Sequence, residues 1–205
     1  MAETAEKTKD SVFDMIKLGL VLVVYAVASC TVLAVVNNFT APKIKQNQID
    51  KANTAMRAVF ADADSFEQVT DFSPSTKGTI TVSDVYLAKK NGKVVGGVAQ
   101  VSGPTYDKGK IIVGLGTDGI ITGMQFLELS DSPGFGLKAN DPTFSLPNRK
   151  TFYGQFTGLD ASGGFTAGKN FDAISGATIT SAGAGELVTE GTGTLLEYFE
   201  RNDYE

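Results

Sequence analysis

The segment at 79–101 reads TITVSDVYLAKKNGKVVGGVAQV, and its pattern decides the fold class of the region that follows. Apolar and polar side chains alternate over 79–88, which places every second residue on one face of a strand. Asn91-Gly92 stands at the centre of a tight turn, because both residues tolerate the positive φ that a two-residue hairpin loop requires. The pattern therefore predicts two antiparallel strands, 79–88 and 94–101, joined by a hairpin.

Two more strand-like segments follow this hairpin. Residues 110–115 (KIIVGL) and 120–129 (IITGMQFLEL) are rich in apolar and β-branched residues, and Asp118-Gly119 supplies the turn between them. Four strands joined by short turns predict an antiparallel meander rather than a parallel nucleotide-binding sheet. Residues 61–78 carry Asp, Ser, Pro and Gly, and we expect them to form a loop.

An apolar segment near the N-terminus predicts a membrane anchor. Residues 18–36 (LGLVLVVYAVASCTVLAVV) carry no charge, and a helix of that length extends roughly 28 Å, close to the thickness of a bilayer core. A cleaved signal peptide and a lipoprotein signal ending at Cys30 are the rival interpretations. The apolar run continues past Cys30 and is longer than a signal core, which favours a transmembrane helix.

Two further helices are expected, one at 45–60 with an amphipathic pattern and one at about 181–202. The second contains several glycines, and each interior glycine costs about 1 kcal/mol of helix propensity relative to alanine. This helix should therefore pack closely against a neighbour or break near Gly191. The predicted fold class is α+β, with a tail at 1–17, a transmembrane helix at 18–36 and one domain at 37–205.

The composition excludes several classes of function. The chain has 18 Lys and Arg against 23 Asp and Glu, a net charge of −5, which argues against binding to nucleic acid. It has no histidine and one cysteine, which excludes a His-dependent triad, a His-ligated metal and a Cys-ligated cluster. Any redox chemistry must therefore come from a cofactor that needs neither residue type.

Two loops carry residues suited to binding an anion or a planar ring. The first, at 130–136, reads SDSPGFG, and its glycines leave backbone amides open. The second, at 172–178, reads DAISGAT and precedes the last helix, whose N-terminus favours a phosphate. Simpler interpretations are an ordinary turn for the first loop and a helix cap at Thr180 or Ser181 for the second.

A third glycine pattern, Gly114-x-Gly116-x-x-Gly119, mimics a dinucleotide-binding fingerprint. It lies between two predicted strands and no helix follows it, so we interpret it as a β-turn.

The second loop resembles the flavinylation motif of the FMN-binding domain family. Together with the apolar segment at 18–36, the glycine-rich strands at 79–129 and the Pro-Gly-x-Gly loop, it makes the chain similar to the G subunits of Rnf complexes. The chain is also similar to the C subunits of Na+-translocating NADH:quinone reductases, which are generally longer. The first loop departs from the family pattern His-x-Glu-Thr-Pro-Gly-x-Gly, because Leu129 and Asp131 stand at the His and Glu positions.

This resemblance implies that Thr178 carries FMN through a phosphodiester bond, made by a flavin transferase that uses FAD and a magnesium ion. The chain would relay electrons within a complex that couples electron flow between ferredoxin and NAD to Na+ or H+ transport. It would have no catalytic residue or metal ligand of its own. The other expected cofactor-binding residues are Asp131, Ser132, Pro133, Gly134, Gly136, Asp172, Ser175, Gly176 and Ala177.

The resemblance also implies a location. The N-terminal tail would lie in the cytoplasm, the span in the bacterial inner membrane among its lipids, and the domain on the periplasmic side. Charge alone does not orient the span, since lysines flank it equally on both sides. The partners would be the other subunits of the complex. A rival of another class is a cofactor-free, membrane-tethered binding or assembly module in which Thr178 merely caps a helix.

Overall fold

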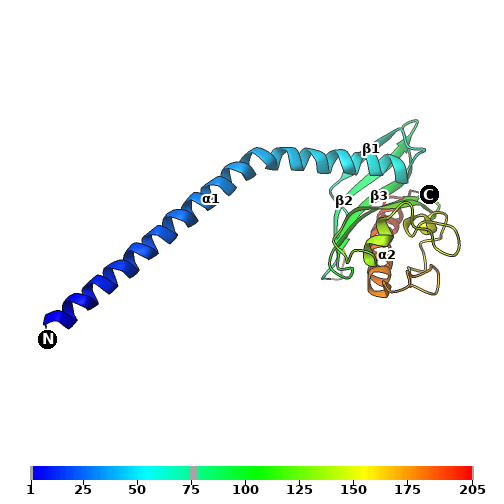
Figure 1. Cartoon of the computed structure of the whole chain (residues 1–205). Helices are drawn as coiled ribbons and strands as arrows, with labels where there is room; N and C mark the ends of the chain where they lie inside the picture. Colours follow the sequence, from blue (N-terminus) through cyan, green and yellow to red (C-terminus); the bar gives the residue numbers. More distant parts are fainter. Residues whose placement is uncertain (1, 74–77, 205) are drawn as a thin grey trace. The chain divides into compact units, whose positions relative to one another are not determined.

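The computed structural model describes residues 2–73 and 78–204, with side chains from Asp14 onward. It contains a long N-terminal helix, a five-stranded antiparallel sheet and a C-terminal helix (Figure 1), which confirms the predicted α+β class. The chain divides into two compact units, residues 1–50 and 51–205, and each is described by itself.

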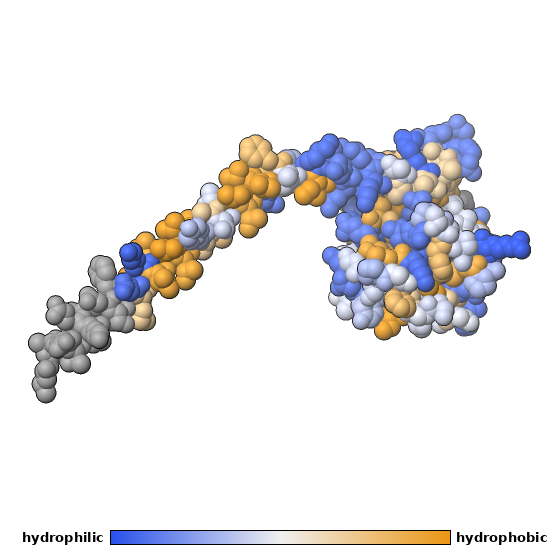
Figure 2. Space-filling model, viewed as in Figure 1, coloured by the Kyte–Doolittle hydropathy of each residue, from blue (hydrophilic) through white to orange (hydrophobic). Residues whose placement is uncertain are grey.

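Helix α1, Ala2–Val59, contains the predicted span and continues through the predicted amphipathic helix without a break. The mean hydropathy of its most apolar stretch is 2.5 and none of that stretch is buried, and Figure 2 shows apolar side chains gathered around it. Thr31 and Thr40 donate their hydroxyls to the carbonyls of Val27 and Val36 at 2.8 and 2.9 Å. Within the described residues, α1 is the helix that is long and apolar enough to cross a membrane.

The five strands pair in chain order, and every neighbouring pair is antiparallel. Asn91 and Gly92 have φ values of 51° and 77°, so the predicted hairpin turn is confirmed. The strands are β1 (Ser65–Val69), β2 (Thr81–Lys90), β3 (Lys93–Gly103), β4 (Gly109–Gly116) and β5 (Ile121–Leu129).

The loop predicted at 61–78 is wrong where β1 lies, because β1 pairs with β2 and forms an edge of the sheet. The sequence of β1 is SFEQV, and of these residues Val69 alone is buried. An edge strand that covers little core does not need alternating apolar side chains, which is why its sequence resembles a loop.

The two faces of the sheet are covered by different helices. Helix α2, Thr178–Arg201, packs its apolar side on one face in the main core cluster, which includes Ala99 of β3. The last turns of α1 pack on the other face in a smaller cluster, which includes Val98. Val98 and Ala99 are adjacent in sequence but belong to different clusters, because successive strand residues point to opposite faces.

On the α1 face, the glycines that permit close packing belong to the sheet. A Cβ atom on Gly96 would lie 2.5 Å from Cε2 of Phe60, and one on Gly123 would lie 2.9 Å from Cα of Val59. Real Cβ atoms do not approach other atoms so closely. The end of α1 therefore fits against the sheet only because side chains are missing there.

On the α2 face, both the sheet and the helix carry such glycines, and a Cβ atom on Gly97 of β3 would lie 2.8 Å from Cδ2 of Leu195. A Cβ atom on Gly191 would lie 2.7 Å from Cγ2 of Val101 and 2.9 Å from Cγ1 of Val113. Helix α2 runs without a break through Gly191, so the close-packing alternative is confirmed and the predicted break is wrong. Its start at Thr178 is three residues before the predicted one.

The segment between β5 and α2 contains two short 3-10 helices, Gly136–Asn140 and Tyr153–Phe156. Four phenylalanines pack in ring contacts with centroid distances from 4.8 to 6.0 Å, and all four are buried. They are Phe152, Phe156, Phe165 and Phe171. This aromatic cluster gives the residues before α2 a rigid base.

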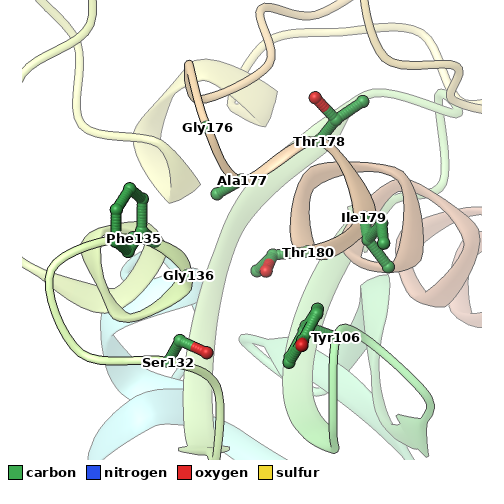
Figure 3. Close-up of a pocket in the computed structure, with 9 residues that line it drawn as sticks. All are labelled: Tyr106, Ser132, Phe135, Gly136, Gly176, Ala177, Thr178, Ile179 and Thr180. Atoms are coloured by element: carbon green, nitrogen blue, oxygen red, sulfur yellow. The ribbon is translucent and has the colours of Figure 1, made fainter.

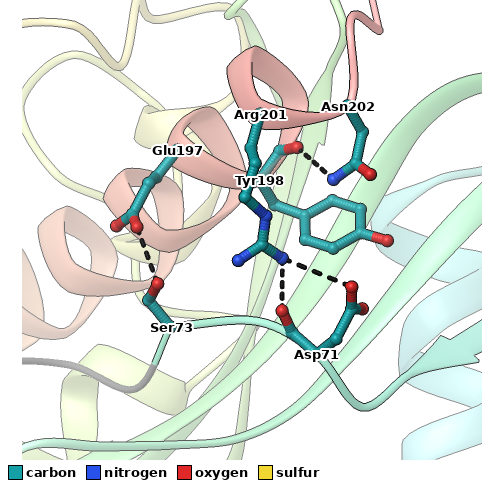
Figure 4. Close-up of polar contacts among 6 residues, drawn as sticks. All are labelled: Asp71, Ser73, Glu197, Tyr198, Arg201 and Asn202. Carbon is teal, nitrogen blue, oxygen red and sulfur yellow. Dashed lines mark hydrogen bonds and ion pairs between the residues drawn. The ribbon is translucent and has the colours of Figure 1, made fainter.

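Polar contacts hold the C-terminal end of α2 (Figure 4). Arg201 forms an ion pair of 3.5 Å with Asp71 and also donates to the Asp71 carbonyl. Ser73 donates its hydroxyl to Glu197 at 2.7 Å. These contacts connect the end of the helix to the segment that follows β1.

Candidate functional site

The turn before α2 leaves the first amides of the helix without a side-chain cap. Ala177 is the N-cap residue, and no side chain among the described residues bonds to the amides there. Ser181 donates its hydroxyl to the Ala177 carbonyl at 2.9 Å and accepts from the Ile174 amide at 3.0 Å. The predicted cap at Thr180 or Ser181 is therefore wrong, and the helix end can receive an external acceptor.

Thr178 and Thr180 differ in accessibility, although both lie in the first turn of α2. Thr178 is exposed, whereas Thr180 is 2% exposed and donates its hydroxyl to the carboxylate of Asp131. Thr178 is thus accessible to a modifying enzyme, while the Thr180 hydroxyl already has a buried partner.

A pocket of about 440 Å³ lies beside this helix end. Its rim has unusual apolar exposure, because Tyr106 is 64% exposed, Phe135 57% and Ile179 60%. Figure 3 shows Tyr106 and Phe135 on opposite sides of the pocket, with Thr180 between them. The lining residues are Tyr106, Ser132, Phe135, Gly136, Gly176, Ala177, Thr178, Ile179 and Thr180.

Asp131 is a buried anchor at this site, only 5% exposed. Its Oδ1 accepts from the Thr105 hydroxyl at 2.6 Å and from the Asp107 amide at 3.0 Å, and its Oδ2 accepts from the Tyr106 amide at 3.3 Å. Burial by itself would raise the pKa of this carboxyl, but the hydrogen bonds from Thr105, Thr180 and the two amides outweigh burial and lower it. Asp131 is therefore ionised at neutral pH and binds the 105–107 segment to the start of α2.

Two glycines shape the pocket. A Cβ atom on Gly136 would lie 2.6 Å from Cβ of Asp131 and 2.7 Å from the Thr180 hydroxyl, so a side chain here would displace the anchor. Gly176 has a φ of 79°, which other residues rarely adopt, and it lies against the ring of Phe135.

The predicted site residues fall into four groups, and Asp172 alone forms the last. Five of them line the pocket: Ser132, Gly136, Gly176, Ala177 and Thr178. Asp131 lies buried and bonds to the pocket residue Thr180, while Pro133, Gly134 and Ser175 lie outside the lining.

Asp172 lies apart from this pocket. Its carboxylate accepts from Asn148 at 3.0 Å, and Gln155 bonds to both its amide and its carbonyl, at 2.8 and 3.1 Å. These contacts fix the backbone at the start of the 172–178 loop, and they do not bring the carboxylate to the pocket.

Tyr106, Phe135 and Ile179 line the pocket, although they are not among the site residues predicted from the sequence. Tyr106 lies between β3 and β4, far in sequence from both candidate loops. Its amide donates to Asp131, and this bond holds it beside the pocket. Ile179 resembles an ordinary apolar helix residue, and its exposure alone distinguishes it. The usable sequence signal was an aromatic residue in a turn, which is weak.

The arrangement can hold a molecule with an anionic group and a flat apolar group. The uncapped helix end suits a phosphate, and the exposed rings suit a planar heterocycle. The volume falls within the range of small-molecule and cofactor sites. No group of three His, Cys, Asp or Glu residues that could hold a metal ion occurs in the described part of the chain. The pocket residues fit FMN, which has a phosphate for the helix end and a flat ring system for the exposed rings.

Two family models match this chain. The FMN-binding domain matches residues 105–192, which include every residue that lines the pocket. The RnfG N-terminal region matches residues 9–59, which lie within α1.

Several relatives cover most of the chain. The G subunit of the Na+-translocating ferredoxin:NAD+ oxidoreductase complex of Acetobacterium woodii is 31% identical, over 97% of this chain and 98% of the relative. The G subunit of the ion-translocating oxidoreductase complex is 28% identical in Vibrio atlanticus, over 91% of each chain. The corresponding protein of Methanosarcina acetivorans is 30% identical, over 82% of this chain and 87% of the relative. By its sequence along nearly its whole length, the chain belongs to the family of G subunits of ion-translocating oxidoreductase (Rnf) complexes.

Proposed function

We propose that this chain is a membrane-anchored electron-transfer subunit of an ion-translocating ferredoxin:NAD oxidoreductase complex, with FMN bound covalently to Thr178. The observation that carries the proposal is the exposed Thr178 hydroxyl at the uncapped start of α2, on a pocket of about 440 Å³. The names of the relatives and the matching FMN-binding domain support the same assignment.

The helix end supports the site of attachment. A phosphodiester on Thr178 would place a negative charge beside the free amides of the first helical turn, where the helix dipole stabilises it. Thr180 is the alternative acceptor, but its hydroxyl is buried and bonded to Asp131. Modification of Thr180 would break that bond and force a bulky group into the core.

The attachment of FMN needs no group of this chain other than the Thr178 hydroxyl. The Thr178 oxygen would form a bond to the FMN phosphorus of FAD as the pyrophosphate bond breaks, so that AMP would leave and the hydroxyl proton would pass to the surroundings. A flavin transferase with its magnesium ion would be the catalyst.

The bound flavin would supply the electron-accepting and electron-donating chemistry, since the sequence has no histidine and a single cysteine. The chain's own residues then bind and orient. Ser132, Gly136, Gly176 and Ala177 would contact the cofactor, and Asp172 would fix the attachment loop through Gln155. Pro133, Gly134 and Ser175 would shape the two loops from outside the pocket.

The N-terminal helix would anchor the domain to a membrane. Residues 18–36 would span the bacterial inner membrane, residues 1–17 would lie in the cytoplasm, and residues 37–205 would form the FMN domain on the periplasmic side. Other subunits of the complex would deliver and remove electrons, and lipid would surround the exposed apolar stretch of α1.

The test is flavin fluorescence of the full-length chain in a denaturing gel after coexpression with a flavin transferase. The wild-type band should fluoresce, Thr178→Val should be dark, and Thr178→Ser should recover fluorescence because it restores the hydroxyl. Circular dichroism should show all three chains folded, since Thr178 is exposed.

Two outcomes would contradict the proposal. A dark wild-type band would favour the cofactor-free membrane module. A fluorescent Thr178→Val band would show a different acceptor, and fragmentation of the peptide that contains Thr178 and Thr180 would identify it.

A further inference from the structure

We propose that Tyr106 and Phe135 hold the isoalloxazine ring between them, and that Asp131 is a positioning residue that fixes Tyr106. This inference rests on the proposed function, and it assigns to the flavin ring residues that neither the motif nor the family match singles out. The phosphate would be held at the start of α2, and the ring would lie between the two aromatic side chains.

Tyr106 and Phe135 leave their rings exposed in a domain that buries its other aromatic side chains at least in part. Phe152 and Phe156, in the same part of the domain, are both 0% exposed, so the fold buries aromatic side chains where it can. Tyr106 and Phe135 are 64% and 57% exposed and line one pocket. Apolar surface left exposed in a concave site indicates a missing partner, and their positions on opposite sides of the pocket leave room for a flat one (Figure 3).

The rigidity of both supports is the second argument. The Phe135 ring rests against Gly176, where a Cβ atom would lie 3.2 Å from Cδ1 of the ring. On the other side, Asp131 accepts from the Tyr106 amide at 3.3 Å and also holds the residues before and after it. The backbone that carries Tyr106 and one side of the Phe135 ring are therefore held before a ligand enters, which lowers the entropic cost of binding.

The chemistry of the two rings matches that of an isoalloxazine. Flat aromatic systems attract one another in offset-stacked geometry. A tyrosine in contact with an excited flavin also quenches its fluorescence by donating an electron, whereas phenylalanine is too hard to oxidise to do so. Contact of the flavin ring with Tyr106 therefore has its own spectroscopic signature.

The experiment compares full-length, covalently loaded chains in detergent by time-resolved fluorescence and anisotropy of the flavin. The variants are Tyr106→Leu, Tyr106→Phe and Phe135→Leu, and the control is Tyr86→Leu, whose tyrosine packs under α1 on the other face of the sheet. In-gel fluorescence after denaturation measures the covalent load of each chain.

Removal of one ring should lower the ratio of docked to mobile flavin about fivefold, which is the change expected for loss of one aromatic pair. Tyr106→Leu and Phe135→Leu should therefore lower the anisotropy at unchanged covalent load. Tyr106→Phe should keep the anisotropy but lengthen the fluorescence lifetime, because it retains the stack and removes the quencher. Tyr86→Leu should behave as wild type.

Asp131→Asn tests the positioning role. It should lower the docked ratio in the wild-type background and have little further effect in Tyr106→Leu, because it acts through Tyr106. Additive losses in the double variant would overturn that part of the proposal.

The two proposals fail in different ways. Wild-type anisotropy and lifetime in all the ring variants, with fluorescent gel bands, would overturn the ring site and leave the covalent flavin standing. A dark wild-type band would overturn the proposed function, and the ring site with it.

Discussion

The two faces of the sheet differ in where the glycines that permit close helix packing lie. Under the end of α1, the sheet supplies the glycines and the helix supplies the side chains, Val59 and the adjacent Phe60. Under α2, both layers supply glycines, because Gly191 of the helix lies against valines of the sheet and Gly97 of the sheet lies against Leu195 of the helix. Both arrangements bring a helix unusually close to the strands, but they leave different surfaces free.

The α1 face holds the end of the N-terminal helix, whereas the α2 face carries the pocket. The α1 face has a small cluster built on one short helical segment, which continues from the apolar stretch of α1. The α2 face has the main core, and the start of its helix carries the pocket. The α1 face should therefore depend on a few contacts, and the α2 face on many.

The largest effect is expected for Gly96→Ala on the α1 face. The new methyl group would clash with the Leu115 carbonyl and lie 2.5 Å from Phe60, and the backbone of a central strand cannot move away. We expect a loss of about 3 kcal/mol in the free energy of unfolding, measured by urea denaturation of the detergent-solubilised chain. Gly163→Ala is the control, because no atom lies within 4 Å of its Cβ position. Equal stabilities of the two variants would refute close packing on this face.

Asp131→Asn should lower the free energy of unfolding by about 2 kcal/mol at neutral pH, because several hydrogen bonds to a buried carboxylate are weakened. The pKa of Asp131 lies below its ordinary value of 3.8. The stability that its charge contributes is thus fully present above that value and is lost as the pH falls through the lowered pKa.

Urea denaturation at a series of pH values would measure this. The difference in the free energy of unfolding between wild type and Asp131→Asn should be constant from about pH 8 to 5 and should decrease below about pH 4. The exposed neighbour Asp107→Asn should change stability by less than about 0.5 kcal/mol. A gap that widens toward acid pH would mean that the carboxyl is protonated in the folded chain.

The smallest effects on stability are expected at two glycines of α2, Gly191 and Gly193. Gly191→Ala gains about 1 kcal/mol of helix propensity but overpacks against two stiff valines, for a net loss of about 1 kcal/mol. Gly193→Ala has open space around its Cβ position and should stabilise the chain by about 1 kcal/mol. In thermal denaturation, the midpoint temperatures of the two variants should shift in opposite directions from that of the wild type. Stabilisation by both variants would mean that helix propensity alone decides the outcome at both positions, and destabilisation by both would mean that Gly193 is also closely packed.

Local patterns were sufficient to predict much of this fold. The turn at Asn91-Gly92 and the alternation in β2 depend on neighbours in sequence, so they are visible without tertiary structure. The strand β1 was missed because its partner β2 lies across a long loop and its own side chains remain exposed.

The start of α2 was placed wrongly for a tertiary reason. Thr180 and Ser181 are good capping residues, but one bonds to the distant Asp131 and the other to the turn before the helix. The pocket was foreseen where residues are close in sequence, as at 176–178. It was missed at Tyr106, which a buried carboxylate holds beside that loop.

The proposed attachment of FMN at the first residue of α2 would also raise the local concentration of flavin at the pocket. A ring tethered to Thr178 would encounter the neighbouring pocket at an effective concentration in the millimolar range, whatever the amount of free flavin outside. A pocket with a Kd of about 1 mM for untethered flavin would then still be occupied about half of the time. The domain would have no need to close over its cofactor, and a partner could reach the ring directly from solvent.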